Sequence, residues 1–245
     1  DVSPHQLACQ LSLGEQEVFA QVGLNEYRNG NFSSKEKDRK APQVVQLIQR
    51  FNKISFWVAT SILLAVGTDA SARQRGQIIT FFINTMEHLK EMKNFNSLMQ
   101  IYSALNMSCI SRLERAWSNV SNRNRQTMEE MGKLFSSNYK SYRDIIELCK
   151  VEPSPPVIPL QEVILRDLTF IEENPNLLDN GWIYFEKMLL LGKSFKNIIK
   201  FQTNLYDFEP NDALQEFINS HVVFTDDELY DQSKRVEPVR KSKAD

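Results

Sequence analysis

Apolar residues recur along most of the chain at the spacing of three and four residues that is typical of helices. The clearest series would lie along one helical face: Phe185, Met188, Gly192, Phe195 and Ile199. It predicts an amphipathic helix whose apolar face is turned toward a core. Further stripes with this spacing are Val44, Ile48, Phe51, Ser55, Val58 and Ile62; Ile78, Phe82, Met86 and Leu89; and Phe95, Leu98, Tyr102 and Leu105. No stretch alternates like a strand, so the pattern predicts an all-α fold.

Polar residues and prolines mark where these helices end. Asn94 lies between two stripes, where we expect its side chain to cap a new helix. The segment 152–156 holds three prolines and cannot continue a helix. After it come a short apolar helix, polar turns at 172–176 and 179–181, and the long amphipathic helix. This order predicts a helical hairpin over about residues 160–203.

The pattern predicts a single multi-helix domain over residues 1–225, from which the hairpin protrudes. Residues 226–245 are acidic and then basic, ending in the run 240–243, and they predict a loosely held polar tail. We find no internal repeat of the length that helical solenoids have. Because the first residue is Asp1 and not methionine, we expect the chain to be a fragment of a longer protein.

Composition narrows the possible functions. Eight glycines and nine prolines in 245 residues are few for an all-β protein. A formal net charge of −2 lacks the basic footprint of a nucleic-acid-binding protein, so we expect no nucleic-acid partner. Three scattered cysteines, Cys9, Cys109 and Cys149, offer no disulfide framework and favour a reducing, cytoplasmic location. The longest apolar run, 56–66, is too short to span a membrane.

Motifs for bond chemistry are missing from the sequence. The run 192–194, Gly-Lys-Ser, lacks the glycine that a phosphate-binding loop needs five residues earlier. The three histidines are far apart, and no nucleophile motif occurs, so we expect no metal, no cofactor and no covalent catalysis. The adjacent carboxylates Glu172 and Glu173, taken alone, are more typical of a solvated acidic turn than of an acid–base pair.

Several motifs occur in a fixed order along nearly the whole chain. Residues 7–13 read LACQLSL, 94–96 read NFN, 103–106 read SALN, 112–117 read RLERAW, 155–159 read PPVIP, 166–175 read RDLTFIEENP and 184–188 read YFEKM. This series resembles the catalytic domain of Ras-type guanine nucleotide exchange factors, the RasGEF domain. The stretch 89–117 is the most specific part of the resemblance. The run FEKM at residues 185–188 is similar to the corresponding run in exchangers that act on Rap.

The resemblance implies a protein that binds a Ras-subfamily small GTPase (Ras, Rap or Ral), most tightly when the GTPase is nucleotide-free. Such a domain accelerates GDP release, so that GTP can load, without covalent chemistry. The resemblance implies that the hairpin is the part of the domain that opens the nucleotide site of the GTPase, as a wedge. Leu168 and Thr169 would crowd the magnesium site of the GTPase, Glu172 or Glu173 would place a carboxylate near the phosphates, and Asn174 would lie beside switch I.

A second surface is implied to hold switch II of the GTPase. Its residues would be Gln49, Asn106, Ser108, Ser111, Arg112, Glu114, Asn138 and Tyr139. Arg112 fits an internal ion pair as well as a partner contact. Tyr102, Leu105 and Trp117 have helical spacing and are more typical of core support. Recruitment to the inner membrane surface would use regions outside this chain.

Two departures from the family pattern keep alternatives open. The family usually has a glycine where Glu173 here runs directly into Asn174. A second usual glycine, soon after the PP.IP motif, is replaced by Gln161 and Glu162. The runner-up interpretation is therefore a scaffold or adaptor that keeps the fold and binds a GTPase or another signalling protein without exchange activity. A third, an unrelated helical interaction module, does not account for the pattern in 89–117.

Overall fold

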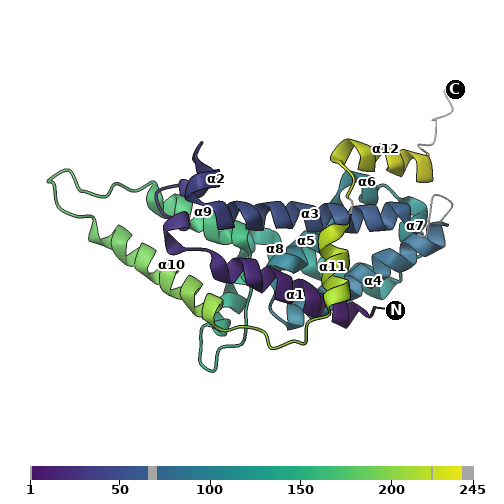
Figure 1. Ribbon diagram of the computed structural model, residues 1–245, viewed down its shortest axis with the longest axis horizontal. Coiled ribbons are helices and arrows are strands. Elements are labelled where there is room, and N and C mark those ends of the chain that lie inside the picture. Colours follow the sequence, from purple (N-terminus) through teal and green to yellow (C-terminus); the bar gives the residue numbers. More distant parts are fainter. Residues whose placement is uncertain (1, 66–70, 222, 239–245) are drawn as a thin grey trace.

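The computed structural model describes residues 2–65, 71–221 and 223–238. In these ranges the chain forms twelve α-helices and two 3-10 helices, with isolated β-bridges but no strand. Figure 1 shows an elongated molecule with a central bundle of helices, from which one light-green helix and the loop before it extend. The prediction of an all-α domain is confirmed.

Four long helices form the core of the bundle: α1 (Pro4–Gln21), α3 (Pro42–Leu64), α4 (Ala72–Glu91) and α5 (Phe95–Asn106). They pack on one another pairwise. Ser3 and Ser71 form capping boxes at the starts of α1 and α4, and the Ser97 amide donates to Asn94 Oδ1 at 3.0 Å. The Asn94 cap was predicted from the sequence and is confirmed.

The predicted stripes of α4 and α5 are largely buried, with Phe82, Met86, Leu89, Phe95, Leu98 and Leu105 all inside the core. On α3 the stripe is only partly correct. Val44, Ser55, Val58 and Ile62 are buried, whereas Ile48 is 40% exposed and Phe51 is half-buried. The exposed part of the stripe lies beside α9 in a groove described below.

A buried polar cluster holds α1, α3 and α5 together. The fully buried Glu15 carboxylate accepts from Arg50 Nε at 3.1 Å, Asn96 Nδ2 at 2.6 Å and Gln100 Nε2 at 3.1 Å. An unpaired carboxylate in this place would cost several kcal/mol, so the three donors are what allow Glu15 to stay inside. The cluster fixes how the three helices lie against each other.

Short elements connect α1 to α3: η1 (Leu24–Tyr27), η2 (Asn31–Ser33) and α2 (Lys37–Lys40). We refer to residues 24–33 as the N-terminal connection. Tyr27 is fully buried, and its hydroxyl is hydrogen-bonded to the Gln161 side chain, with Gln161 Nε2 donating at 3.1 Å. The N-terminal connection is therefore attached to the first turn of α9.

After α5 come α6 (Ser108–Ser111), α7 (Glu114–Ser118) and the long α8 (Asn122–Cys149). α8 is interrupted by a kink at residues 136–139. Ser137, Asn138 and Tyr139 have φ values of 51°, 59° and 60°, in the left-handed region. This conformation costs roughly 1–2 kcal/mol per residue for L-amino acids other than glycine.

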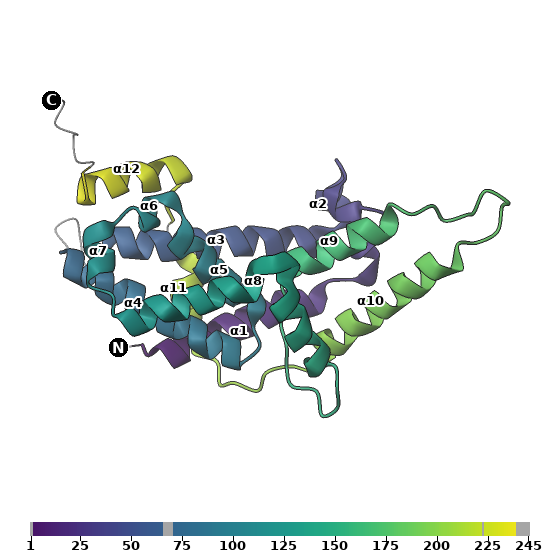
Figure 2. The ribbon, with the colours of Figure 1, turned by 180° about the vertical axis from the view of Figure 1, so that it is seen from behind.

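The proline-containing segment after α8 ends that helix, as predicted. Its last part pairs with the start of α5, where the Phe95 amide donates to Ile158 O at 2.9 Å. Then follow α9 (Gln161–Glu172), a tip segment of residues 173–184, and α10 (Phe185–Thr203). α9 and α10 pack against each other and lie where the sequence predicts the hairpin helices. Figures 1 and 2 show the tip segment at the extreme end of the molecule.

The prediction of which side of α10 faces the core is wrong for four of its five residues, and only Phe195 is partly buried against the core. Phe185, Met188 and Ile199 are 66%, 37% and 45% exposed, and Gly192 is also exposed. The residues that the helix buries are Lys187, Leu191, Ile198 and Phe201. Periodicity identifies an amphipathic helix, but it does not show which face a neighbouring helix covers. Because α10 projects from the bundle, much of its apolar face has no intramolecular partner.

The prediction of a loosely held tail is also wrong for residues 226–236. After α11 (Asp212–Ser220), these residues form α12 (Asp226–Val236), which packs on α3 and α6. Thr225 supplies a capping box, and Leu229 and Ser233 are fully buried. Two buried positions one turn apart are a weak signal among many charges, which explains the error. The basic run 240–243 lies outside the described residues.

Candidate functional site

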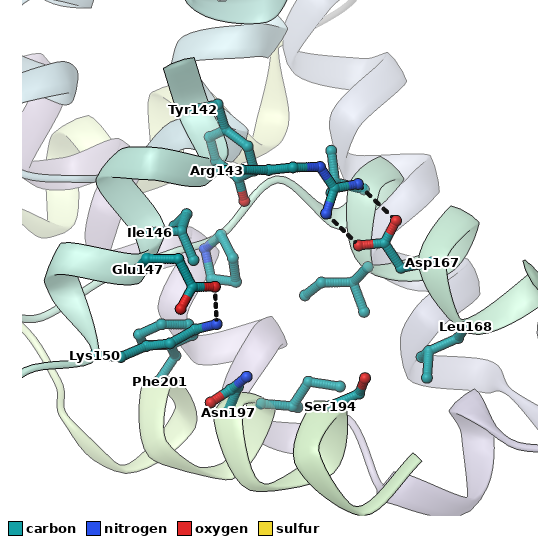
Figure 3. Close-up of a pocket in the computed structure, with 14 residues that line it drawn as sticks. Tyr142, Arg143, Ile146, Glu147, Lys150, Asp167, Leu168, Ser194, Asn197 and Phe201 are labelled. Atoms are coloured by element: carbon teal, nitrogen blue, oxygen red, sulfur yellow. Dashed lines mark hydrogen bonds and ion pairs between the residues drawn. The ribbon is translucent and has the colours of Figure 1, made fainter. Parts of the chain in front are cut away.

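Adjacent predicted wedge residues on α9 face different directions. Leu168 is 1% exposed and lines a cavity between α8, α9 and α10 (Figure 3). Thr169 is exposed, and its hydroxyl donates to Leu165 O at 2.8 Å. The next residue, Phe170, is 59% exposed. Thr169 is thus on the outer surface of α9, whereas Leu168 belongs to the packing beneath it.

Glu172, at the end of α9, is held by internal contacts. One carboxylate oxygen accepts from the Asn29 amide at 3.0 Å, and the other lies 3.1 Å from the Lys187 ammonium. Burial acts to raise the pKa of Glu172. The hydrogen bonds from Asn29 and Lys187 and the charges of Lys187 and Arg28 outweigh it, so the pKa lies below the ordinary value. Glu172 is therefore a paired, ionised carboxylate near neutral pH.

Glu173, the next residue, is exposed at the start of the tip segment. Asn174 Nδ2 donates to Phe170 O and Ile171 O, both at 3.2 Å, which satisfies carbonyls that the end of a helix leaves unpaired. The two residues border an open groove of about 580 Å³ between the tip segment and the N-terminal connection. The groove therefore presents one free carboxylate, that of Glu173, beside the anchored Glu172.

The base of the α9–α10 pair is joined to α8 around a cavity of about 170 Å³ (Figure 3). Arg143 on α8 donates from both terminal nitrogens to the Asp167 carboxylate, at 2.7 and 2.6 Å. These hydrogen bonds raise the pKa of Arg143. Ile198 and Phe201 bring the apolar side of α10 to the same cavity. A two-pronged ion pair fixes orientation as well as distance, so it sets the direction in which α9 leaves the bundle.

The predicted switch II residues at the end of α5 and in α6 and α7 are mostly exposed: Asn106, Ser108, Ser111 and Glu114. Arg112 has an internal role instead. Its guanidinium donates to Ser233 O at 2.7 Å and to Glu237 O at 2.8 Å, and these carbonyls belong to the C-terminal end of α12. Leu105 is buried as expected, and Tyr102 and Trp117 are half-buried against the core.

Asn138 and Tyr139 lie in the kink of α8 and contact α9. The Tyr139 hydroxyl donates to Glu162 Oε1 at 2.9 Å, and Arg166 Nη2 donates to Asn138 Oδ1 at 2.7 Å. The Arg166 guanidinium also lies 4.8 Å from the centre of the Tyr139 ring. Burial, together with the bond to Glu162 and its charge, raises the pKa of Tyr139. The kink therefore braces the outer side of α9.

An apolar groove of about 220 Å³ lies between α3 and α9 and was not predicted from the sequence. Its walls include Ile48 and Phe51 from α3 and Leu165 from α9. Gln49, a predicted contact residue, is exposed next to Ile48. Because Ile48 and Phe51 belong to a helical stripe, their spacing predicted core positions and carried no sign of a surface groove.

Exposed apolar residues on the tip segment and α10 were also not predicted from the sequence. The most exposed of them are Trp182 at 74%, Phe185 at 66%, Ile183 at 64%, Leu177 at 54% and Leu189 at 48%. Single exposed apolar residues are normal on protein surfaces, whereas several large ones in one segment are typical of interaction sites. We call these five residues the apolar tip surface.

Within residues 2–65, 71–221 and 223–238, no group of three or more His, Cys, Asp or Glu side chains is arranged to hold a metal ion. None of the helices in the described ranges is long and apolar enough to cross a membrane. What the described site offers is a projecting carboxylate, apolar surfaces and an apolar groove.

Comparison with known proteins identifies the class of this domain. The sequence model of the RasGEF domain family matches residues 6–189, which include α9, the tip segment and the start of α10. The chain belongs to the RasGEF domain family.

Three relatives from Dictyostelium discoideum are similar to nearly the whole chain. Ras guanine nucleotide exchange factor Q is 32% identical over 99% of this chain, factor A is 32% identical over 100%, and factor M is 33% identical over 97%. The chain spans 18%, 42% and 25% of the lengths of these relatives, respectively. The similarity therefore concerns one region of each longer relative.

Proposed function

We propose that this chain is a guanine nucleotide exchange factor for a Ras-subfamily GTPase (Ras, Rap or Ral). It binds the GTPase, accelerates the release of GDP and lets GTP load, without making or breaking a covalent bond. The observation that carries the proposal is that α10 and the tip segment project from the bundle, with Glu173 exposed where α9 meets the tip segment and large apolar side chains exposed on the tip segment and α10. Membership of the RasGEF family supports this role.

The proposed mechanism is electrostatic and steric. Glu173 is inserted beside the nucleotide phosphates, and like charges repel strongly in a cleft from which water is partly removed. Thr169 lies about one turn of helix before Glu173. It is placed to crowd the magnesium ion, whose charge normally neutralises the phosphates. Both effects lower the affinity of the GTPase for nucleotide. The Asn174 side chain donates to Phe170 O and so stabilises the end of α9 next to Thr169 and Glu173.

The second contact in this proposal is with switch II. The groove formed by Ile48, Phe51 and Leu165 accepts an apolar side chain of the GTPase, and the exposed Gln49 supplies a polar contact at its edge. Further polar contacts come from the exposed residues of α5, α6 and α7: Asn106, Ser108, Ser111 and Glu114. Arg112 is assigned to the support of α12 and not to the partner.

Thermodynamic linkage explains how nucleotide releases the domain from the GTPase. The nucleotide-free GTPase is the form that the domain binds most tightly, so nucleotide must weaken the complex by the same factor by which the domain weakens nucleotide binding. Incoming GTP or GDP therefore releases the domain. The net replacement of GDP by GTP follows from the supply of nucleotide.

The test is the release of a fluorescent GDP from Ras, Rap and Ral, each with and without the 245-residue chain, alongside a direct binding measurement. Faster release from at least one GTPase supports exchange activity. The second candidate, a scaffold without exchange activity, is favoured by the missing glycine between Glu173 and Asn174. It predicts binding to a GTPase with no change in the release rate.

A further inference from the structure

Lys187 is a buried lysine in the first turn of α10. Of the lysines in the described ranges, Lys187 alone is buried, with 2% of its side chain exposed. A positive charge in the first turn of a helix is disfavoured by the dipole of that helix. Burial adds a further cost unless the charge is paired. Lys187 therefore needs a strong set of partners outside its own helix.

Those partners are all at the end of α9. The Lys187 ammonium lies 3.1 Å from Glu172 Oε2, and it donates to Glu172 O at 3.3 Å and to Asn174 O at 2.6 Å. An ammonium has three hydrogens, and here there are three acceptors. Two of these are carbonyls just where α9 ends, where a helix leaves acceptors unpaired and its dipole attracts a cation.

The tip segment has few other attachments to α10. Two of its backbone hydrogen bonds are internal: the Leu178 amide donates to Trp182 O at 2.7 Å, and the Tyr184 amide donates to Asn176 O at 3.0 Å. Its direct bonds to α10 are local to Tyr184, whose carbonyl accepts from the Met188 amide at 3.5 Å and whose hydroxyl donates to Glu186 Oε2 at 3.3 Å. The Asn174 side chain bonds back to α9. Within the described residues, Lys187 is the side chain that hydrogen-bonds α10 to the point where α9 meets the tip segment.

Glu172 extends this connection to a third segment. The Asn29 amide, in the N-terminal connection, donates to the Glu172 oxygen that does not contact Lys187. The end of α9 is thus held from two sides, by α10 through Lys187 and by the N-terminal connection through Asn29. Glu173 and Asn174 follow directly after this anchored point, so their positions depend on it.

We propose that Lys187 is a positioning residue that locks the end of α9 to α10 and so holds Glu173 and Asn174 in place for entry into the GTPase. This inference rests on the proposed exchange function. Lys187 does not touch the nucleotide. It keeps the tip segment ordered before the GTPase binds, so that ordering this segment does not weaken binding. Loss of the lock lowers the maximal exchange rate more than it lowers affinity.

The test replaces the charge and keeps most of the side-chain volume, as Lys187→Met. In the 245-residue chain, we expect amide hydrogen exchange in residues 173–184 to become at least about tenfold faster, with no change in α1, α3 and α5. We expect the maximal rate of fluorescent GDP release to fall by about tenfold, at an unchanged half-saturating concentration. A purely structural lysine would not separate these two kinetic constants.

Two further variants complete the experiment. Lys193→Met removes an exposed lysine from the same helix and should leave both measurements unchanged. The double variant Glu172→Gln, Lys187→Met removes both charges, so no carboxylate is left unpaired if the single variant folds poorly. It should show the same loss of protection and of maximal rate as Lys187→Met.

The outcomes distinguish the positioning role of Lys187 from the proposed exchange function. If the single and double variants keep parental amide protection, or lose protection at the tip but keep the parental maximal rate, the positioning role is overturned. If the tip loses protection and the unmodified chain accelerates release from no GTPase, the lock is supported and the proposed function is overturned. Loss of both protection and maximal rate supports the inference.

Discussion

Glu172 and Glu173 are adjacent in sequence but have different environments. Glu172 is paired with Lys187 and the Asn29 amide, whereas Glu173 is exposed at the start of the tip segment. The sequence predicted that one of the two carboxylates would act on the nucleotide but did not separate them. Burial and pairing assign Glu172 to the support of the tip and leave Glu173 as the proposed acting carboxylate.

This difference predicts different results for the two alanine variants. Glu173→Ala should slow fluorescent GDP release by about tenfold, equivalent to about 1.4 kcal/mol, because the repelling charge is lost. Its free energy of unfolding should stay within about 0.5 kcal/mol of the parent. Glu172→Ala should lower the free energy of unfolding by about 1–3 kcal/mol, because Lys187 loses its counter-charge.

Urea unfolding and GDP release, measured on both variants, check this prediction. Glu216→Ala is the matched control, since Glu216 is an exposed carboxylate on α11, far along the chain from the tip. It should behave as the parent in both assays. Unchanged GDP release by Glu173→Ala would refute the assignment of the acting carboxylate.

At the scale of the element, α10 carries apolar residues toward solvent. The prediction of an amphipathic helix was correct, but the residues it buries are one position away from the predicted face, at Lys187 and Leu191 instead of Met188 and Gly192. Periodicity depends on the local sequence, whereas burial depends on which helix lies alongside. The apolar tip surface is therefore a consequence of tertiary structure that the sequence pattern does not contain.

We expect Phe185→Ser to raise the half-saturating concentration of the GTPase by about tenfold, because a large apolar contact at the proposed interface is lost. The free energy of unfolding should not fall, since Phe185 is 66% exposed. Leu191→Ala, on the buried side of the same helix, should instead lower the free energy of unfolding by about 2–4 kcal/mol. If Phe185→Ser leaves the kinetic constants unchanged, the apolar tip surface is not part of the interface.

The kink of α8 gives a second prediction at this scale. Ser137 has a φ of 51°, its side chain is exposed, and glycine adopts this conformation without steric cost. Ser137→Gly should therefore raise the free energy of unfolding by about 1 kcal/mol, measured by urea unfolding. Ser136, with a φ of −78°, is the control, and Ser136→Gly should not stabilise the protein. Equal effects of the two variants would contradict a strained kink.

At the scale of the whole molecule, the sequence predicted the all-α class, the Asn94 cap and the end of α8 before the prolines. These features depend on local spacing and on residues that start or stop helices. The sequence did not predict the folded α12 or the groove between α3 and α9. Both depend on which surfaces meet after folding, as the hydrogen bonds from Arg112 to the end of α12 illustrate.

The protein consists of a bundle of helices and of α10 with the tip segment, which project from this bundle. Glu15 and its donors hold the bundle, the Arg143–Asp167 pair sets the base of α9, and Lys187 holds its end. Each successive contact lies closer to the tip. In the proposed function, this arrangement delivers the Glu173 carboxylate to the partner as part of a rigid body.

Exchange activity is decided by the rate of fluorescent GDP release from Ras, Rap and Ral, measured with increasing amounts of the 245-residue chain. We expect a saturable acceleration on at least one of the three GTPases, which Glu173→Ala reduces and Glu216→Ala leaves unchanged. Release at the intrinsic rate from all three GTPases, under conditions where the chain binds one of them, would contradict the proposed exchange activity.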